Sequence, residues 1–175
     1  MLRVLDITGP DILQGNGIRC TLWVSGCRHH CPLCHNRWTW EYNQGMIYKE
    51  NKEDIYEKIS SYLSKEYYEG ITLSGGDPLC QDSSGLEELN ELLEFVKKEF
   101  PDKNVWLYTG YTLSELKSKY DDNIHKILDK CDVIVDGRFE NDKKDISLAF
   151  RGSSNQTIYE KVNGEFQVSK YNDIK

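Results

Sequence analysis

Short apolar segments alternate with amphipathic segments along the chain, and this alternation predicts strands joined by helices. Residues 3–7 and 19–25 are rich in β-branched and aromatic side chains, which is typical of strands. Residues 52–67 carry apolar side chains three and four positions apart, the spacing of an amphipathic helix, and Gly70 is expected to end that helix. A short buried strand is predicted directly afterwards, at 71–74.

The same alternation continues into the second half of the chain. The leucine-rich face of residues 86–100 predicts a second helix, and the apolar residues 105–109 predict the next strand. Thr112 and Glu115 have the spacing of a capping box, so we expect a short third helix that runs to Tyr120.

The last third of the chain is predicted from patterns of the same kind. Its segments are a helix at 123–130, strands at 131–136 and 146–150, and an edge hairpin made of 157–162 and 165–168. The strand at 131–136 is largely apolar and is therefore expected to be covered on both faces. From residue 168 onward we expect a loose tail.

Short strands joined by helices are typical of a parallel α/β sheet with right-handed crossovers. Eight strand–helix units need roughly 200 residues or more, so a chain of 175 residues is too short for a full barrel. We therefore expect an α/β fold, namely a partial, open (β/α) barrel of about five or six mainly parallel strands. Residues 1–175 are expected to form a single domain, because no linker or break in composition divides them.

Composition and charge narrow the possible partners. The chain is 38% hydrophobic and 29% charged, as ordinary globular proteins are. Its net charge of −7, without a run of Lys or Arg, argues against nucleic acid as the main partner. No apolar stretch approaches the ~20 residues that span a bilayer, and the first residues do not form a signal peptide. We expect a cytoplasmic protein without a membrane partner, whose clustered cysteines bind metal rather than form disulfides.

Three cysteines lie close together in what we call the thiol loop, residues 27–36. Cys27, Cys31 and Cys34 directly follow a predicted strand. Thiolates at this spacing bind zinc or an iron–sulfur cluster. A cubane cluster has four irons, so three cysteines leave one iron open, whereas a structural zinc site is closed by four ligands. Histidines in the same loop would also permit a closed site of three Cys and one His, so both readings remain open from this stretch alone.

Glycines and polar residues follow the predicted strands. In parallel α/β proteins, the carboxyl ends of the strands meet at one edge, where ligands bind. The segments at this edge are Ser74-Gly75-Gly76-Asp77-Pro78, Tyr108-Thr109-Gly110-Tyr111, Asp136-Gly137-Arg138 and Phe150-Arg151-Gly152-Ser153. A zinc module needs no such edge, so the arrangement favours a catalytic cluster.

Four motifs occur in a fixed order: Cys27-x3-Cys31-x2-Cys34, Gly75-Gly76-Asp77-Pro78, Asp136-Gly137-Arg138-Phe139 and Arg151-Gly152-Ser153-Ser154-Asn155-Gln156. The first two resemble the radical S-adenosylmethionine (SAM) superfamily. With the other two, the chain is similar to the small activases of glycyl radical enzymes, in particular those that act on anaerobic ribonucleoside-triphosphate reductase. The likeness covers residues 4 to 156, which is nearly the whole chain.

This resemblance implies cofactors, partners and a reaction. Cys27, Cys31 and Cys34 would hold a [4Fe-4S] cluster, and the amino and carboxylate groups of SAM would chelate the open fourth iron. One electron, supplied by a donor such as flavodoxin, would cleave SAM into methionine and a 5′-deoxyadenosyl radical. That radical would take a hydrogen atom from a glycine of the reductase, which is the protein substrate. The cluster and SAM carry the catalysis, so no further catalytic side chain is expected.

The resemblance also implies which residues bind SAM. They are Leu33, Cys34 and His35 on the adenine side, Ser74, Gly75, Gly76 and Asp77 near the amino group, and Asp136 and Arg138 near the methionyl end. Arg138 suits a carboxylate because guanidinium matches its geometry. The alternative for Asp136 and Arg138 is a structural ion pair at a strand end. Arg151 is expected either to cap backbone carbonyls or to contact the partner.

Two other functions remain to be separated from this one. The nearer is activation of another glycyl radical enzyme, such as pyruvate formate-lyase, whose activases tend to carry Asp-Leu-Lys where Asp136-Gly137-Arg138 stands. The more distant is a non-enzymatic zinc-binding interaction module with three Cys and one His. The remaining cysteines, Cys20, Cys80 and Cys131, are expected to be isolated buried residues, and His29 a surface residue of the loop.

Overall fold

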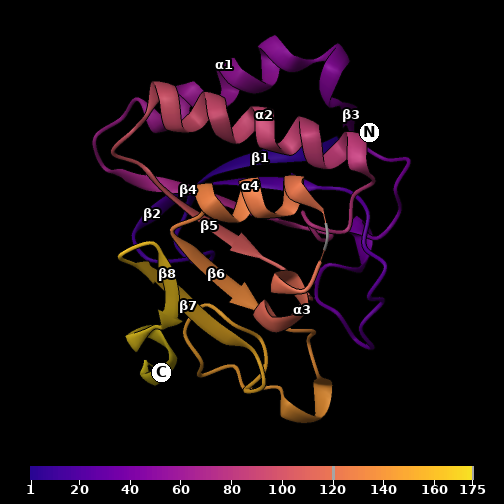
Figure 1. The fold of residues 1–175 in the computed structure, drawn as a ribbon, viewed down its shortest axis with the longest axis vertical. Helices are drawn as coiled ribbons and strands as arrows, with labels where there is room; N and C mark the ends of the chain where they lie inside the picture. The colour runs from indigo at the N-terminus through magenta and orange to yellow at the C-terminus, as the bar shows by residue number, and fades with distance from the viewer. Residues whose placement is uncertain (120, 175) are drawn as a thin grey trace.

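The computed structural model describes residues 1–119 and 121–174 and contains an eight-stranded mixed sheet (Figure 1). The strands are β1 (Arg3–Asp11), β2 (Ile18–Val24), β3 (Met46–Ile47), β4 (Tyr68–Gly75), β5 (Asn104–Tyr108), β6 (Val133–Asp136), β7 (Thr157–Val162) and β8 (Glu165–Val168). The α-helices are α1 (Lys52–Leu63), α2 (Ser83–Glu99), α3 (Leu113–Lys117) and α4 (Asp122–Lys130).

The sheet has a parallel centre and antiparallel edges. Its order is β3-β1-β2-β4-β5-β6-β7-β8, and β2, β4, β5 and β6 run parallel to one another. On one side β1 and β3 are antiparallel additions, and on the other side β7 and β8 are. The expected α/β class is confirmed, but the expected five or six mainly parallel strands are wrong, because hairpins extend both edges of a four-stranded parallel centre.

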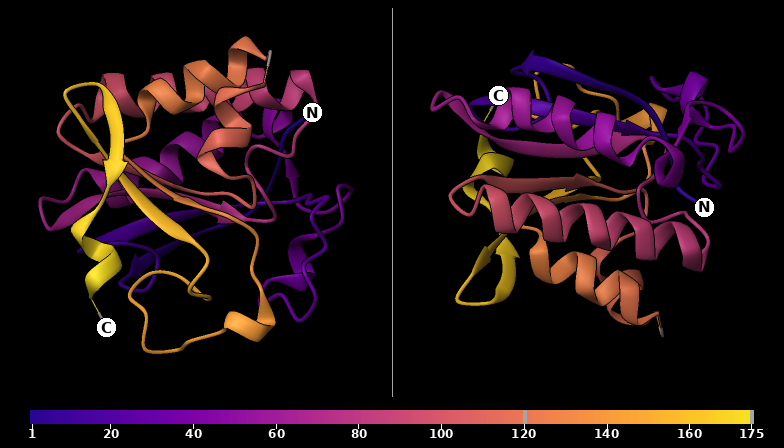
Figure 2. Two further views of the ribbon diagram at one scale, coloured as in Figure 1. Left: turned by 60° about the horizontal axis from the view of Figure 1, so that its bottom comes forward. Right: turned by 90° about the horizontal axis from the view of Figure 1, so that it is seen from above.

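Helices cover one side of this sheet and shape its main core. Helices α2 and α4 lie side by side in each view, and α1 lies beside the strands that precede it (Figures 1 and 2). Apolar side chains of these helices pack on the sheet, among them Ile55, Ile59, Leu89, Leu93, Ile124 and Ile127. Each such side chain stabilises the fold by roughly 1.5–3 kcal/mol when it is fully buried.

A smaller apolar cluster lies around Trp106 and includes Val133, Val135 and Ile158. Residues 169–174, which belong to the segment expected as a loose tail, fold against this cluster. The Ser169 backbone N–H donates to the Ile158 carbonyl at 2.9 Å, and the Tyr171 ring lies 5.5 Å from the Trp106 ring.

The first helix is shorter than the periodicity predicts. It ends at Leu63 rather than at residue 67, and Tyr68 already begins β4. Gly70 does not end the helix, because it lies inside β4. A Cβ atom there would lie 1.9 Å from the Asn104 carbonyl oxygen, so this glycine serves the close approach of β4 and β5.

The capping box at the start of α3 is confirmed. The Thr112 hydroxyl accepts from the Glu115 backbone N–H at 3.2 Å, and the Glu115 carboxylate accepts from the Thr112 N–H at 2.7 Å. Helix α3 ends at Lys117, and the predicted end at Tyr120 lies outside the described residues.

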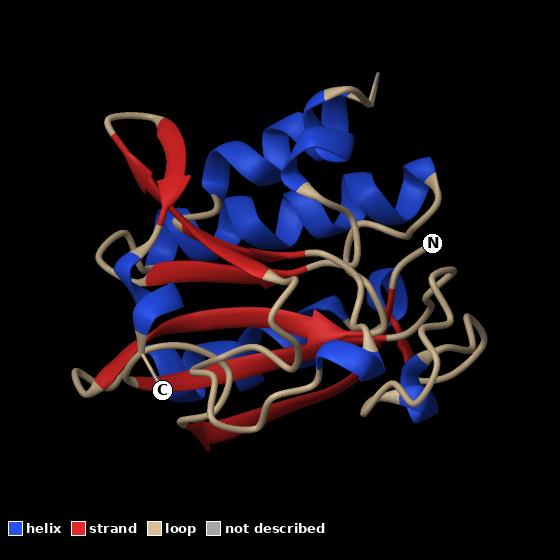
Figure 3. Ribbon diagram, turned by 90° about the horizontal axis from the view of Figure 1, so that it is seen from below, coloured by secondary structure: helices blue, strands red, loops and turns tan. Residues whose placement is uncertain are grey.

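The edges of the sheet show one correct and one wrong prediction. The hairpin of β7 and β8 is confirmed, and its turn consists of Asn163 and Gly164 with φ of 52° and 84°. The strand predicted at 146–150 is wrong, because this segment forms turns in which Ile146 is 92% exposed. Figure 3 draws the strands in red and shows that they gather in one sheet. None of the helices in residues 1–119 and 121–174 has the length and apolarity needed to cross a membrane.

Candidate functional site

The thiol loop leaves the end of β2 and folds back on itself. The Gly26 N–H donates to the Thr39 carbonyl at 2.8 Å, and the Cys27 N–H donates to the Trp40 carbonyl at 3.1 Å. Within the loop, the Cys34 N–H donates to the Cys31 carbonyl at 3.1 Å. All three cysteines are free thiols; Cys27 is buried and the other two are half-buried.

Backbone strain shapes the loop between its cysteines. His30 and Leu33 have φ of 47° and 58°, a left-handed conformation that few residues other than glycine adopt. The His30 ring stacks on the Trp40 ring with centroids 4.6 Å apart. In this conformation Leu33 is 60% exposed, and His35 is exposed as well.

Gly75 and Gly76 join the end of β4 to the start of the thiol loop. The Gly76 N–H donates to the Val24 carbonyl at 2.9 Å, and the Asp77 N–H donates to the Gly26 carbonyl at 2.8 Å. A Cβ on Gly76 would lie 2.3 Å from the Gly26 carbonyl oxygen, and one on Gly75 would lie 2.5 Å from that of Val24. Packing alone therefore requires both glycines, whether or not a ligand also approaches them.

Asp77 is the buried centre of this region, only 1% exposed. Its carboxylate accepts from His29 Nε2 at 2.7 Å, Thr109 Oγ1 at 3.0 Å, the Gly110 N–H at 2.9 Å and the Leu79 N–H at 2.8 Å. Burial raises the pKa of this carboxyl, and the hydrogen bond with His29 opposes that rise. The carboxylate ties the thiol loop to the ends of β4 and β5.

Cys80 and His29 lie in the same buried group, which the sequence did not indicate. Cys80 Sγ is 3.5 Å from His29 Nε2 and 3.6 Å from the Tyr111 hydroxyl. A hydrogen bond between the two thiols lowers the pKa of Cys80 and raises that of Cys27. Burial lowers the pKa of His29, but its hydrogen bonds with Asp77 and Cys80 outweigh this and raise it to about 9.

The expectation that Cys80 is isolated and that His29 is a surface residue is therefore wrong. The Cys80 N–H donates to the Asp77 carbonyl at 3.0 Å, so a tight turn brings Cys80 back toward the carboxylate. The Asp-Pro dipeptide at 77–78 is the sequence signal of such a turn.

Asp136 and Arg138 do not form an ion pair with each other. The buried Asp136 carboxylate accepts from the Leu113 N–H at 2.6 Å and from the Thr157 N–H at 3.2 Å. Arg138 is exposed, and its Nη1 lies 3.2 Å from Glu115 Oε1. Asp136 thus holds the start of α3 and of β7, while Arg138 lies at the surface of the site.

The turn at 137–139 contacts the second cysteine of the thiol loop. Burial raises the pKa of Cys31, and the Phe139 backbone N–H and the charge of Arg138 both oppose that rise. Side-chain amides hold this turn: Asn155 Nδ2 donates to the Arg138 carbonyl at 2.8 Å, and Gln156 Nε2 donates to the Gly137 carbonyl at 3.0 Å.

Arg151 holds Gln156, which contacts this turn. Its Nη1 donates to the Gln156 carbonyl at 2.8 Å, and its Nη2 donates to the Asn172 carbonyl at 2.5 Å. Of the two roles considered from the sequence, the structure therefore shows the capping of backbone carbonyls.

The arrangement of the three loop thiols fits a cluster better than a single ion. Among the described residues, the ligand atoms that converge within 4.8 Å of one another belong to His29, Asp77 and Cys80, and not to the three loop cysteines. A tetrahedral zinc ion needs ligands that close, whereas a cubane holds its cysteine sulfurs farther apart. Backbone N–H groups of His29 and Phe139 reach the sulfurs of Cys27 and Cys31, as they do around iron–sulfur clusters.

Comparison with known proteins gives a consistent picture. Residues 13–159 match the family model of the 4Fe-4S single cluster domain. The chain is 45% identical over 150 residues to the anaerobic ribonucleoside-triphosphate reductase-activating protein of Pasteurella multocida, which covers 85% of this chain and 91% of that protein. It is 41% identical over 150 residues to the protein of that name from Escherichia coli K12, with 85% and 92% covered. The Enterobacteria phage T4 protein of the same name is 38% identical over 154 residues, with 88% and 91% covered.

Proposed function

Because the chain belongs to the 4Fe-4S single cluster domain family and to the anaerobic ribonucleoside-triphosphate reductase-activating proteins, we propose that it is a radical SAM activase. Its protein substrate is anaerobic ribonucleoside-triphosphate reductase, on which it installs a glycyl radical. When bound, the [4Fe-4S] cluster supplies the electron that cleaves SAM to methionine and a 5′-deoxyadenosyl radical. A flavodoxin is the proposed one-electron donor.

The observation that carries the proposal is the thiol loop with its three free cysteines. Cys27, Cys31 and Cys34 hold the cluster in this proposal, and the chain offers them from one loop at the carboxyl ends of the parallel strands. Cys80, the thiol beside Cys27, is engaged with His29 and Tyr111. We therefore assign three ligands to the chain and leave the fourth iron to SAM.

The amino end of SAM is assigned to the end of β4. Ser74, Gly75 and Gly76 offer backbone carbonyl groups there, and Asp77 supplies a negative charge from behind them. Since the Asp77 carboxylate already accepts four hydrogen bonds, its role is to hold the strand end and to complement the ammonium charge at a distance.

The other contacts of SAM are assigned to the exposed part of the site. Leu33, Cys34 and His35 line the adenine side. Arg138 binds the methionyl carboxylate after it exchanges its partner, Glu115, for the ligand. Asp136 keeps α3 and β7 in place, so that Arg138 projects from a fixed turn.

The cluster assignment is tested by cleavage of SAM. Anaerobically reconstituted protein, given dithionite and SAM, should release 5′-deoxyadenosine, and Cys34→Ala should lose both this activity and most of the brown colour. The matched control is Cys131→Ala, because Cys131 is a buried cysteine at the C-terminal end of α4. This variant should keep both the activity and the colour. Full turnover by Cys34→Ala would refute the ligand assignment.

The partner assignment is tested by electron paramagnetic resonance. Incubation with the reductase, SAM and reductant should give the doublet of a glycyl radical, and incubation with pyruvate formate-lyase should not. A doublet with the lyase alone would favour the alternative activase function. A colourless protein that binds zinc after anaerobic purification, without SAM cleavage, would favour the zinc-binding module.

A further inference from the structure

A second set of metal-ligand atoms lies beside the thiol loop. His29 Nε2, Asp77 Oδ2 and Cys80 Sγ all lie within 4.8 Å of one another, and Asp77 and Cys80 are buried. The thiol of Cys27 is hydrogen bonded to that of Cys80 but does not belong to this converging group. One sulfur, one imidazole nitrogen and one carboxylate oxygen are donors that zinc accepts in tetrahedral sites whose fourth position is taken by water.

We propose that the cluster-free protein binds one zinc ion through His29, Asp77 and Cys80, with water in the fourth position. This site differs from the closed site of three Cys and one His considered from the sequence, because it uses no cysteine of the Cys27-x3-Cys31-x2-Cys34 motif. It lies outside the proposed function, and the two can succeed or fail separately.

The distances between the ligand atoms are near those of a zinc site. His29 Nε2 is 2.7 Å from Asp77 Oδ2 and 3.5 Å from Cys80 Sγ. Tetrahedral zinc with bonds of about 2.0–2.3 Å keeps its ligand atoms about 3.3–3.8 Å apart. The His29–Asp77 pair must therefore separate by a fraction of an ångström, and the ion takes the place of the hydrogen atom between them.

The groups around the ligands already have the arrangement of an outer coordination shell. Thr109 Oγ1 and the Gly110 N–H both donate to Asp77 Oδ2, and the Tyr111 hydroxyl lies 3.6 Å from Cys80 Sγ. Such contacts orient metal ligands, and the loss of one typically weakens metal binding about 10–100-fold. The site is therefore supported from behind before an ion enters.

A metal site also needs a path from solvent. A hollow of about 250 Å³ lies beside this group and is lined by Cys80, Tyr111, Arg28, Lys119 and Asp121, among others. Because Cys80 forms part of its wall, the hollow brings solvent next to the residue that supplies the sulfur.

Cobalt, a spectroscopic substitute for zinc, tests the site. The double variant Cys31→Ala/Cys34→Ala removes two of the three loop thiols. Titrated anaerobically with Co²⁺, it should bind one ion with the thiolate charge-transfer and visible bands of tetrahedral cobalt, and Zn²⁺ should displace the ion. Adding Cys80→Ala should abolish the bands, whereas adding Cys131→Ala should leave them unchanged. No bands in the double variant, or unchanged bands with Cys80→Ala, would overturn the proposal.

Alkylation of the double variant gives a test that does not depend on a buried substitution. Zn²⁺ should slow the modification of Cys80 by iodoacetamide and leave Cys20 and Cys131 unaffected. Thr109→Val in the same background should weaken Zn²⁺ binding about 10–100-fold. Equal protection of all three cysteines would mean general stabilisation rather than ligation and would count against the site. Release of 5′-deoxyadenosine by the wild-type chain tests the proposed function independently.

Discussion

The two sides of the thiol loop are held by opposite means. On the side that we call the buried side, formed by Cys27, His29, Asp77 and Cys80, hydrogen bonds converge on a carboxylate that is 1% exposed. On the other side, which we call the rim and which consists of Leu33, Cys34, Glu115 and Arg138, the main polar contact is an exposed ion pair. A buried group that loses its partner is left without water, whereas an exposed group exchanges partners at little cost. We infer that the buried side keeps the loop in shape and that the rim receives the ligand.

Replacing the central carboxylate would give the largest effect. Asp77→Ala leaves His29, Thr109 and the Gly110 N–H without their buried acceptor, so the free energy of unfolding should fall by about 3–5 kcal/mol. Asp142→Ala, which removes an exposed acid from the 3-10 helix at Asn141–Lys143, is the control and should change it by less than about 0.5 kcal/mol. Urea unfolding of cluster-free protein measures both, and equal small losses would mean that the buried side does not hold the loop.

The glycine junction should give the next largest effect. Gly76→Ala places a Cβ 2.3 Å from a backbone oxygen that cannot move aside. We expect the free energy of unfolding to fall by about 2–3 kcal/mol.

Gly164→Ala is the matched control for Gly76→Ala. Gly164 has φ of 84° and nothing within 4 Å of its Cβ position, so only the left-handed conformation is penalised. Its expected loss is about 1 kcal/mol. If Gly76→Ala lost no more than this in the same urea experiment, close packing at the junction would not be its main constraint.

A rim substitution should separate binding from stability. Arg138→Ala should lower the free energy of unfolding by at most about 1 kcal/mol, because its ion pair is exposed. The loss of a charged hydrogen bond should weaken SAM binding about tenfold or more. Glu115→Gln breaks the same ion pair but keeps the guanidinium, so SAM binding should not weaken. Calorimetric titration with SAM distinguishes the two, and equal weakening by both variants would contradict the role of Arg138.

The smallest effect should be the pH dependence of the rim. The Thr112 backbone N–H, with help from Arg138, holds the pKa of Glu115 below its usual value. A lowered pKa in the folded state means stability that is present above the unfolded pKa and is lost as pH falls through the folded one. Stability should therefore decline below about pH 4.5 less steeply in Glu115→Gln than in the wild type. Identical slopes in acid titrations of both proteins would show that this carboxylate is not stabilised by folding.

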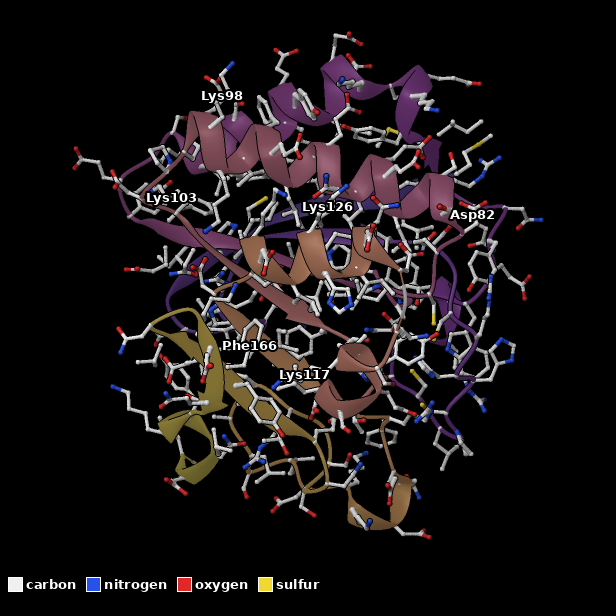
Figure 4. The ribbon with its side chains drawn as sticks, in the orientation of Figure 1. Asp82, Lys98, Lys103, Lys117, Lys126 and Phe166 are labelled. Carbon is white, nitrogen blue, oxygen red and sulfur yellow. The ribbon has the colours of Figure 1, made fainter. Side chains whose placement is uncertain are left out.

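Local patterns predicted the elements that local forces decide. Helix α2 follows from its leucine spacing, and Lys98, labelled in Figure 4, lies on the exposed side of that helix as the spacing requires. The capping box of Thr112 and Glu115 depends on atoms three residues apart, so the sequence was sufficient. The three cysteines of the loop are likewise a local signal.

The wrong predictions share one cause: in each case the structure is decided by a segment that is distant in sequence. The sequence predicts that Gly70 ends a helix, because it does not show that Asn104 of β5 packs against this glycine. The segment 146–150 is apolar enough for a strand, but β7 takes the place beside β6. His29 and Cys80 appear unrelated until the turn after β4 brings both to Asp77, which only the assembled sheet does.

The junction of Gly75 and Gly76 with Val24 and Gly26 has a consequence for how the protein matures. Backbone hydrogen bonds between the end of β4 and the end of β2 fix the start of the loop here. Small zinc fingers, by contrast, remain unfolded until their metal binds. In this chain, the polypeptide should fold first. The cluster should then be inserted into a loop that is already formed, so that maturation is not a step of folding.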